Sequence, residues 1–232
     1  MNTAIITLVP MLMSGLQLTV LVAAVGILCG FVIGSVAGYA LQSRSRVART
    51  LAFVYIWLIR GTPIIVQALY IYYVLPLMLG SNIPSTTAGI IVISINSGAF
   101  IAEIVRGALE SVDNGQKEAG RSLGMSNLQV LIHVVIPPAF RQMVPALFNQ
   151  FIISLKDTSM LTIIVVNEMT QKAMSYAALT FDYVTTYSLL ALFYLALISL
   201  LMVLQKFVER RMNLQRVPKP RLKDLKNKKL AA

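Results

Sequence analysis

Long apolar stretches separated by short polar connections dominate the chain. Five of these stretches reach the roughly 20 residues that a helix needs to cross the hydrocarbon core of a bilayer. They run over 16–41, 51–79, 86–109, 138–166 and 187–207. The pattern predicts an all-α polytopic membrane protein with about five transmembrane helices.

Lysine and arginine gather in alternate connections, and this predicts the orientation of the helices. Three arginines follow the first stretch within 44–49, Lys117 and Arg121 lie in the third connection, and the second connection has none. Ten of the 20 Lys and Arg residues lie in 206–229, mostly after the last stretch. Because basic connections stay on the cytoplasmic side, we expect the N-terminus outside and the C-terminus in the cytoplasm.

The composition argues against a soluble protein. Hydrophobic residues make up 57% of the chain and charged residues 12%, against roughly 25% charged in an ordinary soluble domain. The net charge of +11 comes largely from the end of the chain, where a basic tail over 212–232 suits anionic lipid better than nucleic acid. The single cysteine, Cys29, lies in an apolar stretch, so neither a disulfide nor a metal cluster is predicted.

Four glycines recur every four residues in the first stretch. They are Gly26, Gly30, Gly34 and Gly38. This spacing places them along one face of a helix, where the missing side chains let another helix approach closely. The repeat therefore predicts a packed helical bundle.

The segment 111–137 is much more polar than its surroundings. Asp113 begins a capping pattern, Gly124 suits the end of a short helix, and Ser126 with Gln129 repeats the capping pattern for a second helix. We therefore expect two short helices joined by a glycine turn on the cytoplasmic side.

The same segment resembles the EAA loop of the permease subunits of ABC importers. The matching residues are Glu118, Ala119, Gly120, Gly124, Val134, Ile136 and Pro137. The resemblance implies that this loop docks on a separate cytoplasmic ABC ATPase and transmits its closure to the membrane helices. The implied coupling residues are Lys117, Glu118, Ala119, Gly120, Arg121 and Gly124.

Three further segments resemble the polar amino acid branch of that family, which includes glutamine, histidine, arginine and cystine systems. They are RGTPIIVQ at 60–67, NSGAFIAEIVRGA at 96–108 and LKDTS at 155–159. The resemblance implies one permease domain over 1–211, a bacterial inner-membrane location, and glutamine or a similar substrate. It also implies a second permease copy or a homologous permease, and an extracytoplasmic amino acid-binding protein that reaches the outer loops.

Four charged residues are embedded in the predicted spans: Arg60, Glu103, Lys156 and Asp157. Each costs roughly 2.5–3.5 kcal/mol on insertion scales, so each needs a partner or water. Gly61 and Pro63 beside Arg60, and the polar residues of 156–159, predict broken helices near mid-membrane, which are tolerated where they line a cavity.

Two interpretations of these charges stay open. In the first, Arg60 or Lys156 binds the carboxylate of an amino acid and Glu103 or Asp157 its ammonium group. Gln67, Asn96 and Thr158 would then contact the polar side chain of the substrate. In the second, the four charges pair with one another and only fix the packing of the helices.

No phosphate-binding loop of the form G-x-x-x-x-G-K-[ST] occurs, so the chain is expected to be a non-catalytic subunit without a cofactor of its own. ATP and Mg²⁺ would bind to the partner ATPase. A secondary amino acid transporter and a membrane scaffold without transport activity are the alternatives, and neither needs an ATPase that co-purifies. The sequence leaves open which amino acid is carried, whether the permease pairs with itself or with a homologue, and what the tail does.

Overall fold

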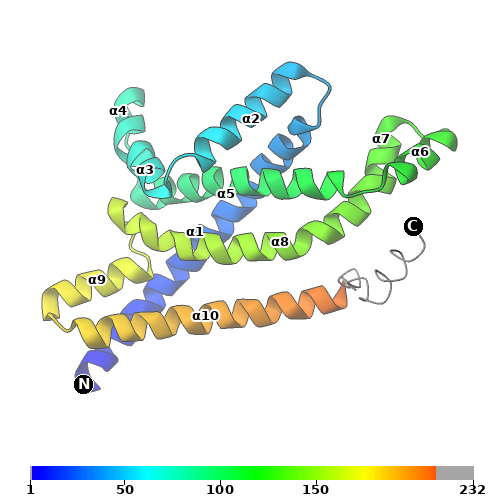
Figure 1. Cartoon of the computed structure of the whole chain (residues 1–232). Coiled ribbons are helices and arrows are strands. Elements are labelled where there is room, and N and C mark those ends of the chain that lie inside the picture. Colours follow the sequence, from blue (N-terminus) through cyan, green and yellow to red (C-terminus); the bar gives the residue numbers. More distant parts are fainter. Residues whose placement is uncertain (1, 213–232) are drawn as a thin grey trace, which may run out of the picture.

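The computed structural model describes residues 2–212, and these residues are almost entirely helical (Figure 1). The elements are α1 (Asn2–Leu41), α2 (Arg46–Arg60), α3 (Ile64–Leu69), η1 (Tyr70–Val74), α4 (Leu75–Leu79), α5 (Ser85–Glu110), α6 (Asn114–Ser122), α7 (Asn127–Gln129), η2 (Val130–Val135), α8 (Ile136–Asp157), η3 (Thr158–Ile164), α9 (Met169–Thr180) and α10 (Tyr183–Arg211). The predicted basic tail lies outside the described residues except for Met212.

Four helical stretches are long and apolar enough to cross a membrane: Ile6–Leu41, Ser85–Glu110, Asn127–Ile164 and Tyr183–Arg211. A fifth candidate is the pair Arg46–Arg60 and Ile64–Leu79, which is bent by 104°. These findings confirm the all-α prediction of about five spans with a broken helix. The first span begins ten residues earlier than predicted, because its helix continues through Pro10.

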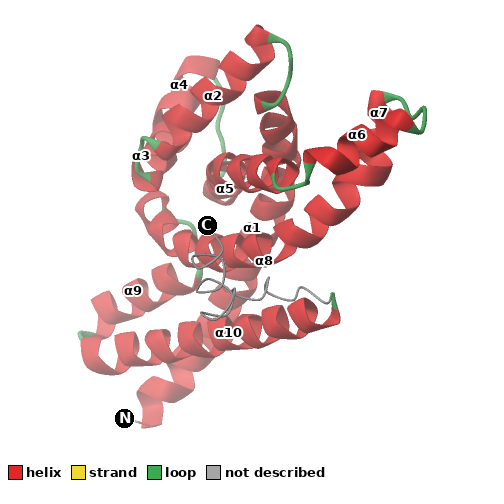
Figure 2. Ribbon diagram, turned by 45° about the vertical axis from the view of Figure 1, so that its right-hand side comes forward, coloured by secondary structure: helices red, strands yellow, loops and turns green. Residues whose placement is uncertain are grey.

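Helix α5 is the centre of the bundle, between α2 and α8 in Figure 2, and α1 packs along it. Of the residues in the apolar 18-residue window of each helix, 67% are buried in α5 but only 6% in α10. An added Cβ at Gly34 would lie 2.6 Å from the carbonyl oxygen of Gly98, and one at Gly38 would lie 2.5 Å from that of Ala102. The glycine face of α1 therefore allows a backbone approach that any other residue would prevent, as the repeat predicted.

Two short π-helical segments, η1 and η2, each end two residues before a proline. The N–H of Leu75, before Pro76, donates to the carbonyl of Tyr70, and the N–H of Ile136, before Pro137, donates to that of Leu131. Because proline has no N–H, the α-helical ladder loses a donor there, and the wider i→i+5 pattern carries the helix across the gap.

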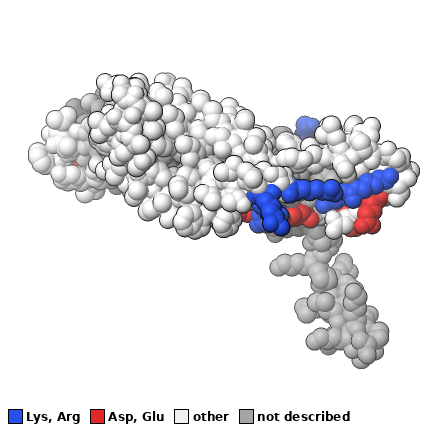
Figure 3. Space-filling model, turned by 90° about the horizontal axis from the view of Figure 1, so that it is seen from above, with Lys and Arg blue, Asp and Glu red and all other residues white. Residues whose placement is uncertain are grey.

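The polar segment after α5 folds as predicted into helices joined by a glycine turn. Asp113 caps α6 by accepting from the N–H of Gly115 at 2.9 Å, and Gly124 has a φ of 79°, which is the left-handed region. Ser126 and Gln129 form a complete capping box at the start of α7. Figure 3 shows that charged side chains gather toward the end of the molecule that carries α6 and α7, while the opposite end is nearly free of them on this face.

Candidate functional site

The bend in the second span is held by a side chain of its own helix. Pro63 has no N–H to donate to the carbonyl of Ile59, four residues earlier. Gln67 Nε2 donates to that carbonyl instead, at 2.8 Å, and also lies 3.0 Å from the carbonyl and the hydroxyl oxygens of Thr62. The break after Arg60 therefore does not leave the Ile59 carbonyl, which is within the bundle, without a donor.

Asn96 of α5 ties this bend to the centre of the bundle. Its Nδ2 donates to Gln67 Oε1 at 3.1 Å, and both side chains are buried, with 7% and 8% exposure. The structure thus brings together two residues that were predicted to contact the substrate side chain. Both ends of the Gln67 amide are engaged by the protein itself.

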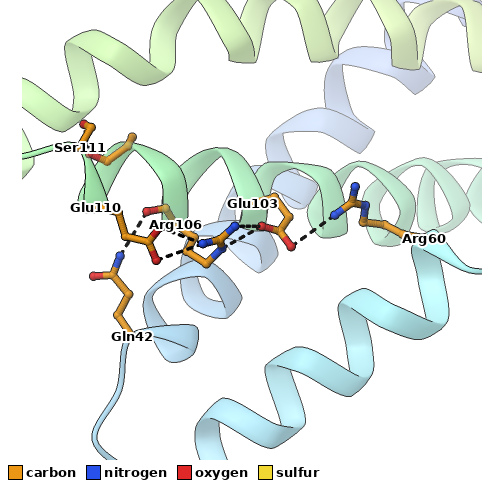
Figure 4. A network of polar contacts seen from close by, with 7 residues as sticks. Gln42, Arg60, Glu103, Arg106, Glu110 and Ser111 are labelled. Carbon is orange, nitrogen blue, oxygen red and sulfur yellow. Dashed lines mark hydrogen bonds and ion pairs between the residues drawn. The ribbon is translucent and has the colours of Figure 1, made fainter.

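A row of alternating charges begins at the same bend and follows α5 (Figure 4). Arg60 Nη1 lies 3.3 Å from Glu103 Oε1, and Glu103 Oε2 lies 2.8 Å from Nε and Nη2 of Arg106. Arg106 Nη1 in turn lies 2.8 Å from Glu110 Oε2. The guanidinium of Arg60 also stacks over Phe100, 5.4 Å from the ring centroid. Two cations and two anions give this row no net charge.

Only half of this row was predicted from the sequence. Pairing of Arg60 with Glu103 was one of the interpretations left open, and the structure brings these two together. Arg106 and Glu110 were missed, although their spacing could have revealed them. Glu103, Arg106 and Glu110 stand at i, i+3 and i+7, the positions that share one face of a helix.

Three of the four residues of the charged row line an open cavity between α2 and α5. The cavity has a volume of about 780 Å³, and its lining includes Arg60, Glu103 and Arg106 together with Arg49 and Trp57. Side-chain exposures of 45% for Arg60 and 31% for Glu103 show that both groups are accessible from it. The cavity therefore offers cations, a carboxylate and an aromatic surface, which together suit a small zwitterion.

The other charged residues of the predicted site lie at the end of α8. Lys156 is exposed, Asp157 is half-buried, and Thr158 is fully buried with its Oγ1 donating to the carbonyl of Leu155 at 2.8 Å. The helix tightens to a 3₁₀ segment directly after Asp157, at the predicted interruption. Of the three ion pairs within residues 2–212, none includes Lys156 or Asp157.

A buried carboxylate that the sequence analysis missed lies beyond this break. Glu168 is fully buried; its Oε1 accepts from the N–H of Gln171 at 2.7 Å, and its Oε2 accepts from Tyr194 Oη at 3.2 Å and Thr19 Oγ1 at 3.5 Å. Burial raises the pKa of the Glu168 carboxyl above its ordinary value. Its position three residues before Gln171, at the start of α9, is an N-cap pattern that could have been recognised. The connection between the predicted spans 138–166 and 187–207 is therefore mostly helix, because α9 begins at this cap.

Each coupling residue predicted in the α6 segment has a distinct place. Glu118 and Ala119 are exposed, and Lys117 and Arg121 lie one turn apart on another face of α6. Gly120 is buried, and an added Cβ there would lie 3.2 Å from Val130 Cγ2. Within residues 2–212, no three His, Cys, Asp or Glu side chains gather in a way that could hold a metal ion.

Comparisons with known proteins agree with this architecture. Residues 26–214 match the family model described as "Binding-protein-dependent transport system inner membrane component". The chain is 40% identical over 213 residues to the glutamine transport system permease protein GlnP of Escherichia coli (strain K12), covering 91% of this chain and 97% of the relative. It is 30% identical to the arginine transport system permease protein ArtQ of Bacillus subtilis (strain 168), covering 90% and 96%.

A solved structure has the same fold. The crystal structure titled as an amino acid ABC transporter with histidines matches with a TM-score of 0.84 and 34% sequence identity, covering 90% of this chain and 97% of the other. Fold, bent span and relatives together define a multi-pass permease subunit of an ABC transporter.

The chain belongs to the family of inner membrane components of binding-protein-dependent transport systems. It is a non-catalytic subunit, and the nucleotide binds to a separate ATPase chain, so this chain has no cofactor of its own. Its transport system also includes a binding protein. The family assignment confirms the predicted resemblance to the permease subunits of ABC importers.

Proposed function

We propose that this permease carries polar amino acids into the cell, with glutamine as the first candidate, and that the cavity beside the bent span is its substrate site. The relatives that are glutamine and arginine transport permeases support the substrate class. The observation that carries the site is the Arg60–Glu103 pair, which places a cation and an anion 3.3 Å apart at a helix break on the wall of an open cavity. A zwitterionic amino acid presents the complementary carboxylate and ammonium groups.

In this proposal Arg60 binds the substrate carboxylate and Glu103 binds the ammonium group. Arg106 holds Glu103 through its second carboxylate oxygen, 2.8 Å away, so the ammonium contact does not need Glu103 to move. Lys156 and Asp157, at the end of α8, do not line this cavity, so their contact with the substrate stays a prediction. Gln67, Asn96 and Thr158 remain the predicted contacts for the substrate side chain, and each would exchange a bond within the protein for one to the substrate.

The experiment that tests the site measures amino acid transport and ATP hydrolysis by the complete complex in liposomes. Arg60→Gln and Glu103→Gln should raise the substrate concentration for half-maximal stimulation by at least about tenfold, because each removes a charge-assisted contact worth about 1.5–3 kcal/mol. Glu110→Gln is the matched control, since Glu110 ends the same charged row but does not line the cavity. An equal loss in all three variants would instead support the interpretation that the row only fixes helix packing.

We also propose that α6 and the turn after it are the cytoplasmic docking piece for the ATPase, with the N-terminus outside and the C-terminus inside. Charge supports this orientation, because Lys117, Arg121 and the basic end of α10 would face the cytoplasm. Glu118 and Ala119 are exposed for contact, Gly120 lets α6 pack closely on η2, and Gly124 makes the turn.

Glu118→Cys, in a chain in which Cys29 is replaced, should crosslink to the ATPase in membranes. It should react with a membrane-impermeant reagent only when the cytoplasmic face of the membrane is exposed to that reagent. Labelling from the outside would contradict both the orientation and the docking. A cysteine at Ser81, in the connection at the other end of the bent span, provides the control with the opposite accessibility.

The permease pathway is proposed to form between two permease subunits, either two copies of this chain or this chain and a homologue. The main support is that the charged row lies on an open wall rather than inside a closed cavity, so the second wall must come from another chain. The exposed aromatic side chains Phe53 and Trp57 on α2 border this opening, with 61% and 67% exposure. The mass of the complex purified by a tag on one copy distinguishes the two pairings.

A further inference from the structure

A second groove lies at the opposite end of α1 from the N-terminus, where the α1–α2 connection faces α6 and η2. Its volume is about 550 Å³. Three cations line it, Arg44 from the connection and Lys117 and Arg121 from α6, and its lining includes no acidic residue. Because Lys117 and Arg121 are four residues apart on one helix, both reach the groove from the same face of α6.

These three charges are not neutralised within the described part of the chain. The ion pairs of residues 2–212 use Arg60 and Arg106 as their cations. Lys117 Nζ donates to the side-chain oxygen of Asn114 at 3.3 Å, which is a neutral acceptor. An anion in the groove would therefore meet three cations without having to displace a carboxylate.

The rest of the lining is mainly apolar, with Gln42, Ser43 and Asn127 as its neutral polar members. Leu109, Val130 and Val135 form part of it and are themselves buried, and Leu131 is partly buried beside them. Tyr39, also in the lining, is 54% exposed and lies two residues before the end of α1 at Leu41. An aromatic side chain at the end of a spanning helix is typical of the membrane–water interface.

We propose that this groove binds an anionic phospholipid, with the phosphate between Arg44, Lys117 and Arg121 and an acyl chain against the apolar lining. A soluble phosphate would offer the same anion to the cations but would leave the apolar lining uncovered, so the lining favours lipid. Basic pockets between spanning helices on the cytoplasmic side are suited to such head groups. The inference rests on the proposed orientation, which places α6 at the inner leaflet.

Of the coupling residues that the resemblance implies, Lys117 and Arg121 line the groove, whereas the exposed Glu118 and Ala119 lie on other faces of α6. Glu118 and Ala119 follow Lys117 by one and two residues, which turns them about 100° and 200° away around the helix, and neither lines the groove. Arg44 lies outside the segment 111–137 altogether. A lipid could therefore occupy the groove while the exposed face of α6 remains free for the ATPase.

Native mass spectrometry of the detergent-purified complex with its ATPase tests the proposal. Phosphatidylglycerol added in mixed micelles should remain bound at about tenfold lower concentration than phosphatidylcholine. Arg44→Gln should weaken retention of phosphatidylglycerol about fivefold, the usual effect of one cation at a lipid surface. Arg46→Gln removes the same charge two residues further on, outside the groove, and should change retention less than about twofold.

Several results would overturn the proposal. Equal losses for Arg44→Gln and Arg46→Gln would indicate general attraction to a basic surface, and displacement of the lipid by millimolar inorganic phosphate would indicate a soluble anion site. An Arg44→Gln complex that keeps the lipid but loses its ATPase would place the groove in the protein interface. If that variant does not assemble, Arg44→Met, which keeps the aliphatic stem without the charge, gives the same comparison. Detergent removes the two sides of the membrane, so a wrong orientation would appear in the cysteine labelling and not here.

Discussion

The contact between α1 and α5 makes a sharp prediction about a single methyl group. In Gly34→Ala the new Cβ would lie 2.6 Å from the carbonyl oxygen of Gly98 and 2.7 Å from Cβ of Ile101. Neither atom can rotate away, because one belongs to the backbone and the other is fixed to it. The helices must therefore separate, and overpacking of this kind costs about 1–3 kcal/mol.

Gly107→Ala is the matched control for that substitution. Gly107 lies in α5, and nothing stands within 4 Å of the Cβ that alanine would add. Because alanine has a higher helix propensity, this variant should be as stable as the original or up to about 1 kcal/mol more stable. The same chemical change should thus have opposite signs at the two positions.

Thermal unfolding of the purified complex in detergent measures the difference. For a chain of this length, each kcal/mol corresponds to roughly 2–4 °C in the midpoint. We expect Gly34→Ala to lower the midpoint by about 2–12 °C and Gly107→Ala to leave it unchanged or raise it. Equal midpoints for the two variants would refute the close approach of α1 to α5.

Three further outcomes are expected. Burial raises the pKa of the Glu168 carboxyl, so the folded state favours its protonated form. The contribution of this group to the free energy of unfolding is therefore fully present below its pKa in the unfolded chain. That contribution is lost as the pH rises through the pKa in the folded chain. Glu168→Gln should remove this dependence of stability on pH, which melting temperatures measured between about pH 4 and pH 8 would reveal. Gln67→Leu should destabilise the complex by about 1–3 kcal/mol, because it leaves the Ile59 carbonyl without its donor. Gln67→Glu should be destabilised in the same unfolding assay, since a carboxylate has no N–H to donate. Gly120→Leu should displace α6 from Val130 and uncouple ATP hydrolysis from transport, while Gly120→Ala should retain coupling; normal coupling in the leucine variant would contradict the close packing.

The sequence predicted those parts of the fold that depend on local pattern. Apolar length located the spans, the glycine spacing identified the packing face of α1, and the cap residues around Gly124 and Ser126 located the short helices. Their partners could not be found in this way. Nothing in the repeat of glycines says that α5 is the helix that lies against it, because packing partners are set by the whole bundle.

The candidate site was predictable only in part for the same reason. Arg60 and Glu103 stood out as charges in apolar surroundings, but their pairing requires α2 and α5 to lie side by side. Gln67 was selected as a polar side chain near a proline, whereas its bond to the Ile59 carbonyl depends on the path of the bent backbone. Glu168 escaped notice because its burial comes from Thr19 and Tyr194, which are far from it in the sequence.

The stretch from Asn127 to Ile164 is helical without interruption by a loop, since the π-helical turn before Pro137 keeps the hydrogen-bonded ladder continuous. At 1.5 Å per residue, the distance from Asn127 to Asp157 is about 45 Å. No loop lies between these two residues. A displacement imposed beside Ser126 would therefore move the polar residues at the far end of α8, because both belong to one continuous helical stretch.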